Sequence, residues 1–155
     1  MDSAMDELLE VLSQIDLLII NDEEARQLSG QYSLLKASEI IREMGPKYLV
    51  IKKGEHGALL FGEGRVFYSP ALLLSEVRDP TGAGDTFAGG LMGYLAGQKN
   101  LDFEVLKQAI TCGSAMASFC VEKFGTEALR DISQEELSER VERFAHMVQF
   151  QVPGW

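Results

Sequence analysis

Two short apolar runs constrain the fold of this 155-residue chain more than any other feature of its sequence. Residues 15–20 hold five apolar residues out of six, and residues 48–52 are a second run of the same kind. Runs this uniformly apolar are typical of buried strands in parallel sheets, because helices cover both faces of such a sheet. The segments between the two runs, residues 22–28 and 34–44, have helical spacing. The order strand, helix, helix, strand predicts an α/β protein.

The remainder of the chain predicts a short helix at residues 5–12, two further strands and three late helices. Glycine-rich turns bound the two strands, at residues 58–61 and 65–68, which makes the middle of the chain a hairpin or meander. An extended connection is predicted at residues 70–77. The late helices are predicted at residues 84–95, at residues 103–123 with Gly125 as the end, and from Ser133 to Val148 with Glu136 completing a capping box.

Charge and cysteine content narrow the partners and the compartment. Twenty-four acidic residues against fourteen Lys and Arg give a net charge of −10, which disfavours nucleic acid and anionic membranes as partners. Cys112 and Cys120 lie about 12 Å apart along a predicted helix, too far for a disulfide, so we expect two buried thiols in a reducing compartment. The acidic start of the chain does not have the pattern of a signal peptide. We therefore predict one compact cytoplasmic domain, residues 1–155.

The stretch at residues 79–90 carries the most chemistry. Gly82 and Gly84 stand where a helical pattern begins, and Asp85 follows at once. The first N–H groups of a helix have no partner within it, so this position can hold an anion such as a phosphoryl group. Asp85 can act there as a general base toward an alcohol, or it can simply complement the helix dipole. The local sequence favours neither interpretation over the other.

Small residues follow a regular spacing on the two helices after this motif. On the first helix they are Gly89, Gly93 and Gly97, and on the second they are Ala109, Gly113 and Ala117. A glycine in a helix interior costs about 1 kcal/mol relative to alanine, so the glycines require a reason. We expect close packing against a neighbouring element rather than contact with a ligand. The two stripes can pack together or leave a slot for a flat ligand.

Three motifs in order resemble those of the ribokinase (PfkB) family of carbohydrate and nucleoside kinases. Residues 79–85 read Asp-Pro-Thr-Gly-Ala-Gly-Asp and are similar to the family signature D-T/P-x-G-A-G-D. Asn21 and Glu24 match its N-x-x-E motif, and residues 52–59 resemble its nucleotide-side strand and turn. Other phosphate motifs fit less well, because no Gly-Lys-Ser or Gly-Lys-Thr occurs and Phe87 stands where a dinucleotide fingerprint requires glycine. The resemblance implies an α/β fold with a ribokinase-like, three-layer arrangement of sheet and helices.

The resemblance also implies ATP-dependent phosphoryl transfer to an alcohol group of a sugar or nucleoside. In that reaction Asp85 is the base that activates the acceptor hydroxyl, and the backbone N–H groups around the γ-phosphate are those of Gly82, Ala83 and Gly84. Asn21 and Glu24 organise Mg²⁺, and Asp79 helps to hold K⁺ in members that bind a monovalent cation. The residues implied at the nucleotide are Lys52, Gly54, Gly57, Thr81 and Ser114.

Several alternatives stay open on the sequence alone. Local sequence favours Asn21 and Glu24 as an N-cap and an exposed helix acid, and Lys52 is equally explained as a solvated charge. Ser114 stands where relatives often have Asn or His near the adenine, which leaves ATP open against another nucleotide. The acceptor is also open among sugars and nucleosides.

The resemblance covers only the C-terminal half of the family. The chain is therefore interpreted as the catalytic and nucleotide-binding half of a kinase, with a non-catalytic nucleotide-binding module or an interaction domain as alternatives. Its ligand crevice is expected at the carboxyl ends of strands, where Asn21 and the Gly82 turn fall. A sheet without its earlier strands exposes an edge and apolar helix faces, so we expect the isolated chain to self-associate through that edge or to be marginally stable.

Overall fold

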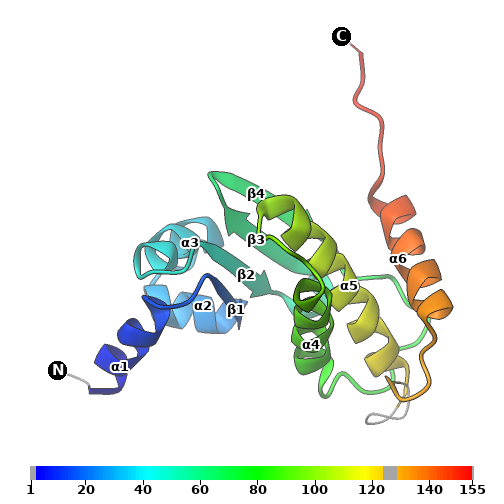
Figure 1. Ribbon diagram of the computed structural model, residues 1–155, viewed down its shortest axis with the longest axis horizontal. Coiled ribbons are helices and arrows are strands. Elements are labelled where there is room, and N and C mark those ends of the chain that lie inside the picture. Colours follow the sequence, from blue (N-terminus) through cyan, green and yellow to red (C-terminus); the bar gives the residue numbers. More distant parts are fainter. Residues whose placement is uncertain (1–2, 124–128, 155) are drawn as a thin grey trace. The chain divides into compact units, whose positions relative to one another are not determined.

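The computed structural model describes residues 3–123 and 129–154, which form two compact units, Met1–Ser69 and Pro70–Trp155. The first unit contains the strands, and the second contains the three late helices (Figure 1). Within the described part of the chain, none of the helices is both long enough and apolar enough to cross a membrane.

The first unit is built on a four-stranded mixed sheet. The strand order is β1-β2-β3-β4, in which β1 and β2 run parallel and β2, β3 and β4 form an antiparallel meander. The α/β class and the meander predicted from the sequence are therefore confirmed. In chain order the elements are α1 (Ser3–Leu12), β1 (Leu17–Asn21), α2 (Asp22–Ser29), α3 (Leu34–Glu43), β2 (Tyr48–Lys52), the 3₁₀ turn η1 (Gly54–His56), β3 (Ala58–Gly62) and β4 (Arg65–Ser69).

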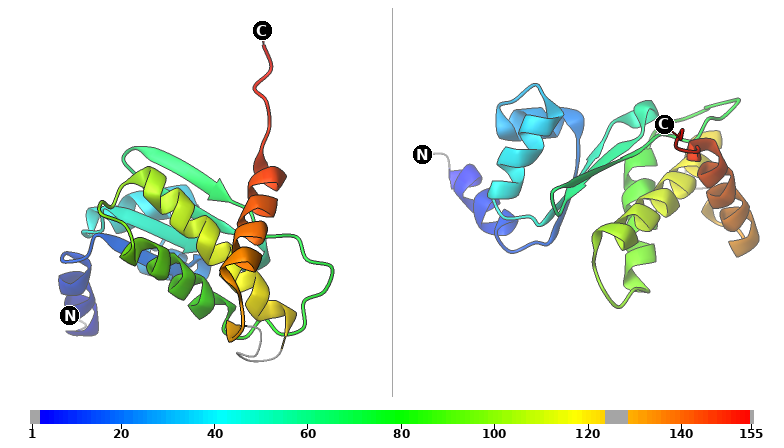
Figure 2. Two further views of the ribbon diagram at one scale, coloured as in Figure 1. Left: turned by 45° about the vertical axis from the view of Figure 1, so that its right-hand side comes forward. Right: turned by 90° about the horizontal axis from the view of Figure 1, so that it is seen from above.

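Helices α2 and α3 pack on one face of this sheet (Figure 2). Successive residues of a strand point to opposite faces, so Leu49 and Ile51 of β2 share the face that the helices cover. There they form a buried cluster with Phe61 of β3, Ala25 of α2 and Ile41 of α3. Leu18 and Ile20 of β1 pack against the same cluster. The core therefore holds the two strands that end at Asn21 and Lys52, two of the residues implied at the site.

Strand β1 differs from the prediction in its bounds and in its burial. It spans Leu17–Asn21 rather than residues 15–20, and all five of its residues are half-buried rather than buried. The reason is its place in the sheet, because within the described residues β2 is its one neighbour. Strand β2 has neighbours on both sides and is buried at its first four positions. A strand with the composition of a central strand thus lies at an edge.

Helix α1 also leaves apolar side chains in solvent. Leu12 at its end is buried, whereas four earlier apolar side chains are exposed: Met5, Leu8, Leu9 and Val11. An amphipathic helix normally buries this stripe. Among the residues that the structure describes, the first unit therefore presents apolar surface on α1 as well as an unpaired edge on β1.

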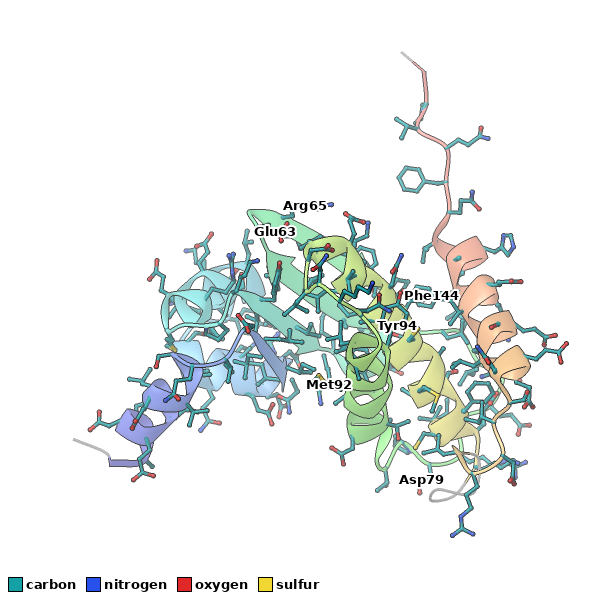
Figure 3. The ribbon with its side chains drawn as sticks, viewed as in Figure 1. Glu63, Arg65, Asp79, Met92, Tyr94 and Phe144 are labelled. Atoms are coloured by element: carbon teal, nitrogen blue, oxygen red, sulfur yellow. The ribbon has the colours of Figure 1, made fainter. Side chains whose placement is uncertain are left out.

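The second unit consists of α4 (Ala83–Ala96), α5 (Phe103–Glu122) and α6 (Gln134–Val148), which follow a segment without regular secondary structure. Helices α4 and α5 lie side by side, and Tyr94 of α4 donates a hydrogen bond to Gln108 of α5 at 2.6 Å (Figure 3). Helix α6 packs on α5, where the Arg140 guanidinium lies 3.9 Å from the centre of the Phe119 ring. The three predicted helices are therefore confirmed as elements.

Glycine allows α4 and α5 to approach closely. A Cβ added at Gly113 would lie 2.6 Å from the backbone oxygen of Phe87, and one added at Gly90 would lie 2.8 Å from the Met116 side chain. Both distances are shorter than real Cβ contacts, so a side chain at either position would push the helices apart.

The predicted close packing of the stripe formed by Gly89, Gly93 and Gly97 on α4 was wrong. A Cβ added at Gly89 or Gly93 would meet no atom of the described residues within 4 Å, and Gly97 is the C-cap of α4. The face of α4 that meets α5 is the one that carries Phe87 and Gly90, one residue away from the predicted stripe.

Several local signals near the helix ends can be compared with the structure. Ser133 and Glu136 form the predicted capping box at the start of α6. Gly125, predicted to end the preceding helix, lies outside the described residues. Both thiols are free, but Cys112 is half-buried and Cys120 alone is buried, which corrects the expectation of two buried thiols.

Candidate functional site

Residues 80–83 form a tight turn immediately before α4. The Ala83 N–H donates to the Pro80 carbonyl at 3.1 Å, and Gly82, the third residue of the turn, has φ 79° and ψ −1°. These angles match the third position of a type II turn, which favours glycine because a side chain is strained at positive φ. The backbone of this turn therefore requires glycine at position 82.

Helix α4 begins at this turn and presents N–H groups at its start. Its first internal hydrogen bond runs from the Thr86 N–H to the Gly82 carbonyl at 2.9 Å, so the N–H groups of Gly84 and Asp85 have no partner within the helix. The Ala83 N–H is already used by the turn. The donors that this geometry offers to an anion are those of Gly82, Gly84 and Asp85, beside the positive end of the helix dipole.

The Asp85 side chain is exposed in the first turn of α4, where the sequence motif places it. An exposed carboxylate at this position is sterically open to a bound alcohol. Its negative charge also stabilises helix α4 by a few tenths to about 1 kcal/mol, because it interacts favourably with the positive end of the helix dipole. The position thus suits both a general base and a dipole partner.

Asp79 and Thr81 are bonded to each other at the start of the turn (Figure 3 labels Asp79). The Thr81 N–H donates to Asp79 Oδ1 at 2.9 Å. Hydrogen bonds from the Thr81 side chain and backbone hold the pKa of the Asp79 carboxyl below its ordinary value. Asp79 is therefore an anion at neutral pH, and its bonds to Thr81 shape the turn whether or not it also meets a cation.

In the first unit, Asn21 and Glu24 form a capping box at the start of α2. Asn21 Oδ1 accepts from the Glu24 N–H at 2.7 Å, and Glu24 Oε2 accepts from the Asn21 N–H at 2.8 Å. The local interpretation of this pair as a helix cap is confirmed. The capping box uses one of the two Glu24 carboxylate oxygens and leaves Oε1 outside it.

The same end of the sheet carries Lys52 and the turn that follows it. Lys52 is the register partner of Asn21, so these side chains leave neighbouring strands side by side and on the same face. The Lys53 N–H closes the turn by donating to Gly57 O at 2.7 Å. Gly54 has φ 56°, and a Cβ added there would meet no described atom within 4 Å. A ligand could approach this backbone closely.

Ser114 has a different environment. It is 9% exposed on α5, one residue after the close contact of Gly113 with α4. Burial of this degree suits a helix-packing residue, and a base contact would need the hydroxyl to reach solvent.

The residues that support the turn were missed by the sequence reasoning. Val121 and Cys120 of α5 contact residues 78–82 through hydrogen bonds and side-chain packing. No local signal marks them, because the Cys120–Thr81 pair is separated by 39 positions in sequence.

A hollow of about 330 Å³ lies on the α5–α6 side of the second unit, lined by Phe119, Glu136, Glu139, Arg140 and Arg143. It contains none of the site residues implied by the sequence. Its most buried cation, Arg140, already donates to Ser118 Oγ and Glu122 Oε2, each at 3.0 Å. This hollow therefore belongs to the packing interface between α5 and α6.

The donor atoms for a metal ion are few. Within residues 3–123 and 129–154, no three His, Cys, Asp or Glu side chains gather into a group that could hold a metal. Mg²⁺ in phosphoryl-transfer sites is commonly held by one or two carboxylates, water and the substrate phosphates. The second carboxylate oxygen of Glu24 fits that pattern, in which the nucleotide supplies the remaining ligands.

Relatives of known name place the chain in a family. Residues 1–132 match the pfkB family of carbohydrate kinases, and the chain belongs to this family. It is 34% identical over 122 residues to the cytidine kinase of Thermococcus kodakarensis and 31% identical over 133 residues to the ribokinase of Haemophilus influenzae. These matches cover 77% and 83% of this chain. The chain spans 42% of the length of each of these two relatives.

Solved structures have the same fold over a similar share of their length. The aminoimidazole riboside kinase of Salmonella enterica, in complex with aminoimidazole riboside and an ATP analog, is 28% identical with a TM-score of 0.79. That match covers 90% of this chain and 46% of the Salmonella chain. The nucleoside kinase of Methanocaldococcus jannaschii is 25% identical with a TM-score of 0.69. The prediction of a ribokinase-like fold, present in part, is confirmed.

Proposed function

We propose that residues 1–155 are the nucleotide-binding and catalytic half of an ATP-dependent phosphotransferase that acts on an alcohol group of a sugar or nucleoside. The observation that carries the proposal is the start of α4. A glycine turn leads there into N–H groups that have no partner within the helix, with an exposed carboxylate in the first helical turn. Family membership supports the reaction class, since the named relatives are kinases.

The chemistry follows from the charge that develops during transfer. The γ-phosphoryl group carries negative charge on its oxygens, and fixed N–H donors stabilise that charge without reorganisation. The N–H groups of Gly82, Gly84 and Asp85 supply these donors, and Ala83 contributes to the turn that aims them. The Asp85 carboxylate accepts the proton of the acceptor hydroxyl as its oxygen attacks phosphorus and the bond to the leaving ADP breaks.

Further residues of the proposal act on the nucleotide and on cations. Lys52, Gly54, Gly57 and Thr81 border the nucleotide. Ser114 belongs to this set on the family resemblance alone, since its burial on α5 favours a packing role. Asn21 and Glu24 hold hydrated Mg²⁺, which when bound neutralises phosphate charge. Asp79 contributes to a K⁺ site. The position of the Asp79 carboxylate supports the last role, since the Thr81 N–H holds this anion beside the turn, where it attracts a cation.

The test separates the base role of Asp85 from its dipole role. Glu135 is the matched control, because it also lies in the first turn of a helix, α6. We expect Asp85→Asn to lower the rate of phosphoryl transfer from ATP by about 10²- to 10⁴-fold with nearly unchanged ATP affinity. Glu135→Gln should change stability as much as Asp85→Asn does and leave transfer intact. Transfer that survives Asp85→Asn would reject the base assignment.

A non-catalytic nucleotide-binding module is the second candidate, favoured by the 42% to 46% of its relatives' length that the chain spans. The chain is mixed with Mg–ATP and with ribose or cytidine, and transfer is compared with calorimetric binding. Binding without transfer to either acceptor supports the module. A chain that shows neither binding nor transfer would contradict both candidates and would favour an interaction domain.

We also propose that the chain works in the cytoplasm on small molecules rather than on nucleic acid or membrane. The free thiols support a reducing compartment.

We further propose that the isolated chain self-associates in solution through the β1 edge and the exposed stripe of α1. The half-buried apolar strand β1 supports this proposal. Val11 on α1 and Val66 on β4 are 56% and 55% exposed, so they form a matched pair. Val11→Lys should lower the apparent molecular mass of the chain in analytical sedimentation, and Val66→Lys should leave that mass unchanged. A monomeric wild-type chain would refute this proposal.

A further inference from the structure

The turn before α4 leans on the last turns of α5. The Val121 carbonyl accepts from the Arg78 N–H at 2.8 Å and from the Asp79 N–H at 3.3 Å. The Cys120 thiol donates to the Thr81 carbonyl at 3.7 Å, within the range for a weak sulfur hydrogen bond. Cys120 is 3% exposed, so this contact is shielded from water.

The Cys120 contact fixes a peptide plane. Thr81 O and the Gly82 N–H belong to one peptide unit, and in a trans peptide they point in opposite directions. Because Thr81 O points toward Cys120, the Gly82 N–H points away from it. A Cβ at Gly82 would lie 4.0 Å from the Cys120 sulfur, so the thiol also packs against the turn.

This peptide is the one that distinguishes two turn types. Types I and II differ by a flip of the central peptide, and at the third residue φ changes from about +80° in type II to about −90° in type I. Glycine accepts both states at little steric cost. A flip would place Thr81 O where the Gly82 N–H now lies and would turn a carbonyl toward a bound anion. Weak forces therefore decide the orientation.

We propose that Cys120 is a positioning residue that holds the Thr81–Gly82 peptide in the type II orientation and so directs the Gly82 N–H toward the anion at the start of α4. The part that concerns the anion rests on the proposed function. The orientation of the turn does not, and it can be measured in the free chain.

The experiment compares Cys120→Ala with Cys120→Ser, which are similar in volume but differ in their hydrogen-bond donor. Cys112→Ala on the same helix is the control for loss of a thiol. The readouts are the Gly82 amide signal by NMR in the free chain and the affinity for inorganic phosphate and Mg–ATP by calorimetry. With Cys120→Ala we expect exchange broadening or a second Gly82 signal and about tenfold weaker binding, the scale of one hydrogen bond to a charged group. Cys120→Ser and Cys112→Ala should stay close to the wild type.

The outcomes are distinct. A Gly82 signal in Cys120→Ala that equals the wild type overturns the proposal, and equal changes in the Ala and Ser variants overturn it in favour of packing alone. A wild-type chain that binds neither phosphate nor Mg–ATP refutes the proposed function, yet the Gly82 signal still decides the turn. Should Cys120→Ala fail to fold, Cys120→Val replaces it as the variant without a donor, since a wild-type Gly82 signal then overturns the proposal and a second or broadened signal supports it.

Discussion

Gly113→Ala tests the close packing of α4 on α5, which positions the candidate site. The added Cβ would lie 2.6 Å from the Phe87 backbone oxygen, and an ordinary contact begins at 3.4 Å, so the helices must separate by about 0.8 Å. A gap of that size forfeits a quarter to a half of each dispersion contact along the joint. Phe87 and Leu91, 7% and 0% exposed, line this contact.

The expected magnitude combines two effects of opposite sign. Overpacking against backbone costs about 3 kcal/mol, the upper end of the usual range, because a carbonyl cannot rotate away as a side chain can. Replacing glycine by alanine in a helix returns about 1 kcal/mol. The net expectation for Gly113→Ala is a loss of about 2 kcal/mol in the free energy of unfolding.

Gly93→Ala is the matched control, because it lies in the interior of α4 with open space around its missing Cβ. It should gain up to about 1 kcal/mol from helix propensity alone. Both variants are compared by urea unfolding followed by circular dichroism at the helical signal. Equal stabilities for the two variants would refute the close approach of α4 and α5.

Three further predictions concern backbone strain, pH and thiol reactivity. Gly82→Ala should cost about 1 kcal/mol of stability and weaken phosphate binding, because it strains the positive φ of the turn, whereas Gly89→Ala should do neither; calorimetry checks this. The hydrogen bond from the Arg26 side chain lowers the pKa of Asp22, and the hydrogen bond from the Ser133 backbone lowers the pKa of Glu136. The two carboxylates therefore stabilise the folded state above about pH 4.5, and this stabilisation is lost as the pH falls through their lowered pKa values in the folded state. The urea midpoint should fall between pH 5 and pH 3, less steeply in Glu136→Gln, and an equal slope in both proteins would contradict the assignment. Burial raises the pKa of the Cys112 thiol, so its alkylation at pH 8 should be slower than that of a free thiol and rise with pH, and a rate equal to that of glutathione would contradict it.

Much of the fold could be predicted because its signals are local. Strand β2 was predicted with the bounds it has, since the apolar run is bounded by Pro46 on one side and glycine turns on the other. The start of α6 was predicted from Ser133 and Glu136, whose capping box spans four consecutive residues.

The parts that could not be predicted depend on neighbours distant in sequence. Strand β1 has the composition of a buried strand, but its burial depends on how many strands stand beside it. Helix α4 is apolar on nearly all sides, so the sequence does not reveal whether Gly89 or Gly90 faces α5. The support of the turn by Cys120 has no local pattern at all. In the site itself, the motif predicted the glycine turn and the place of Asp85, whereas the engagement of the Ala83 N–H came from the structure.

The most direct test of the account is an NMR titration of the free chain with Mg–ATP, followed at the backbone N–H groups. We predict that the largest shifts occur at Gly82, Gly84 and Asp85, while Ala83 shifts less because its N–H stays bonded to Pro80. If other signals move while those of Gly82, Gly84 and Asp85 stay in place, the result would contradict an anion site at the start of α4.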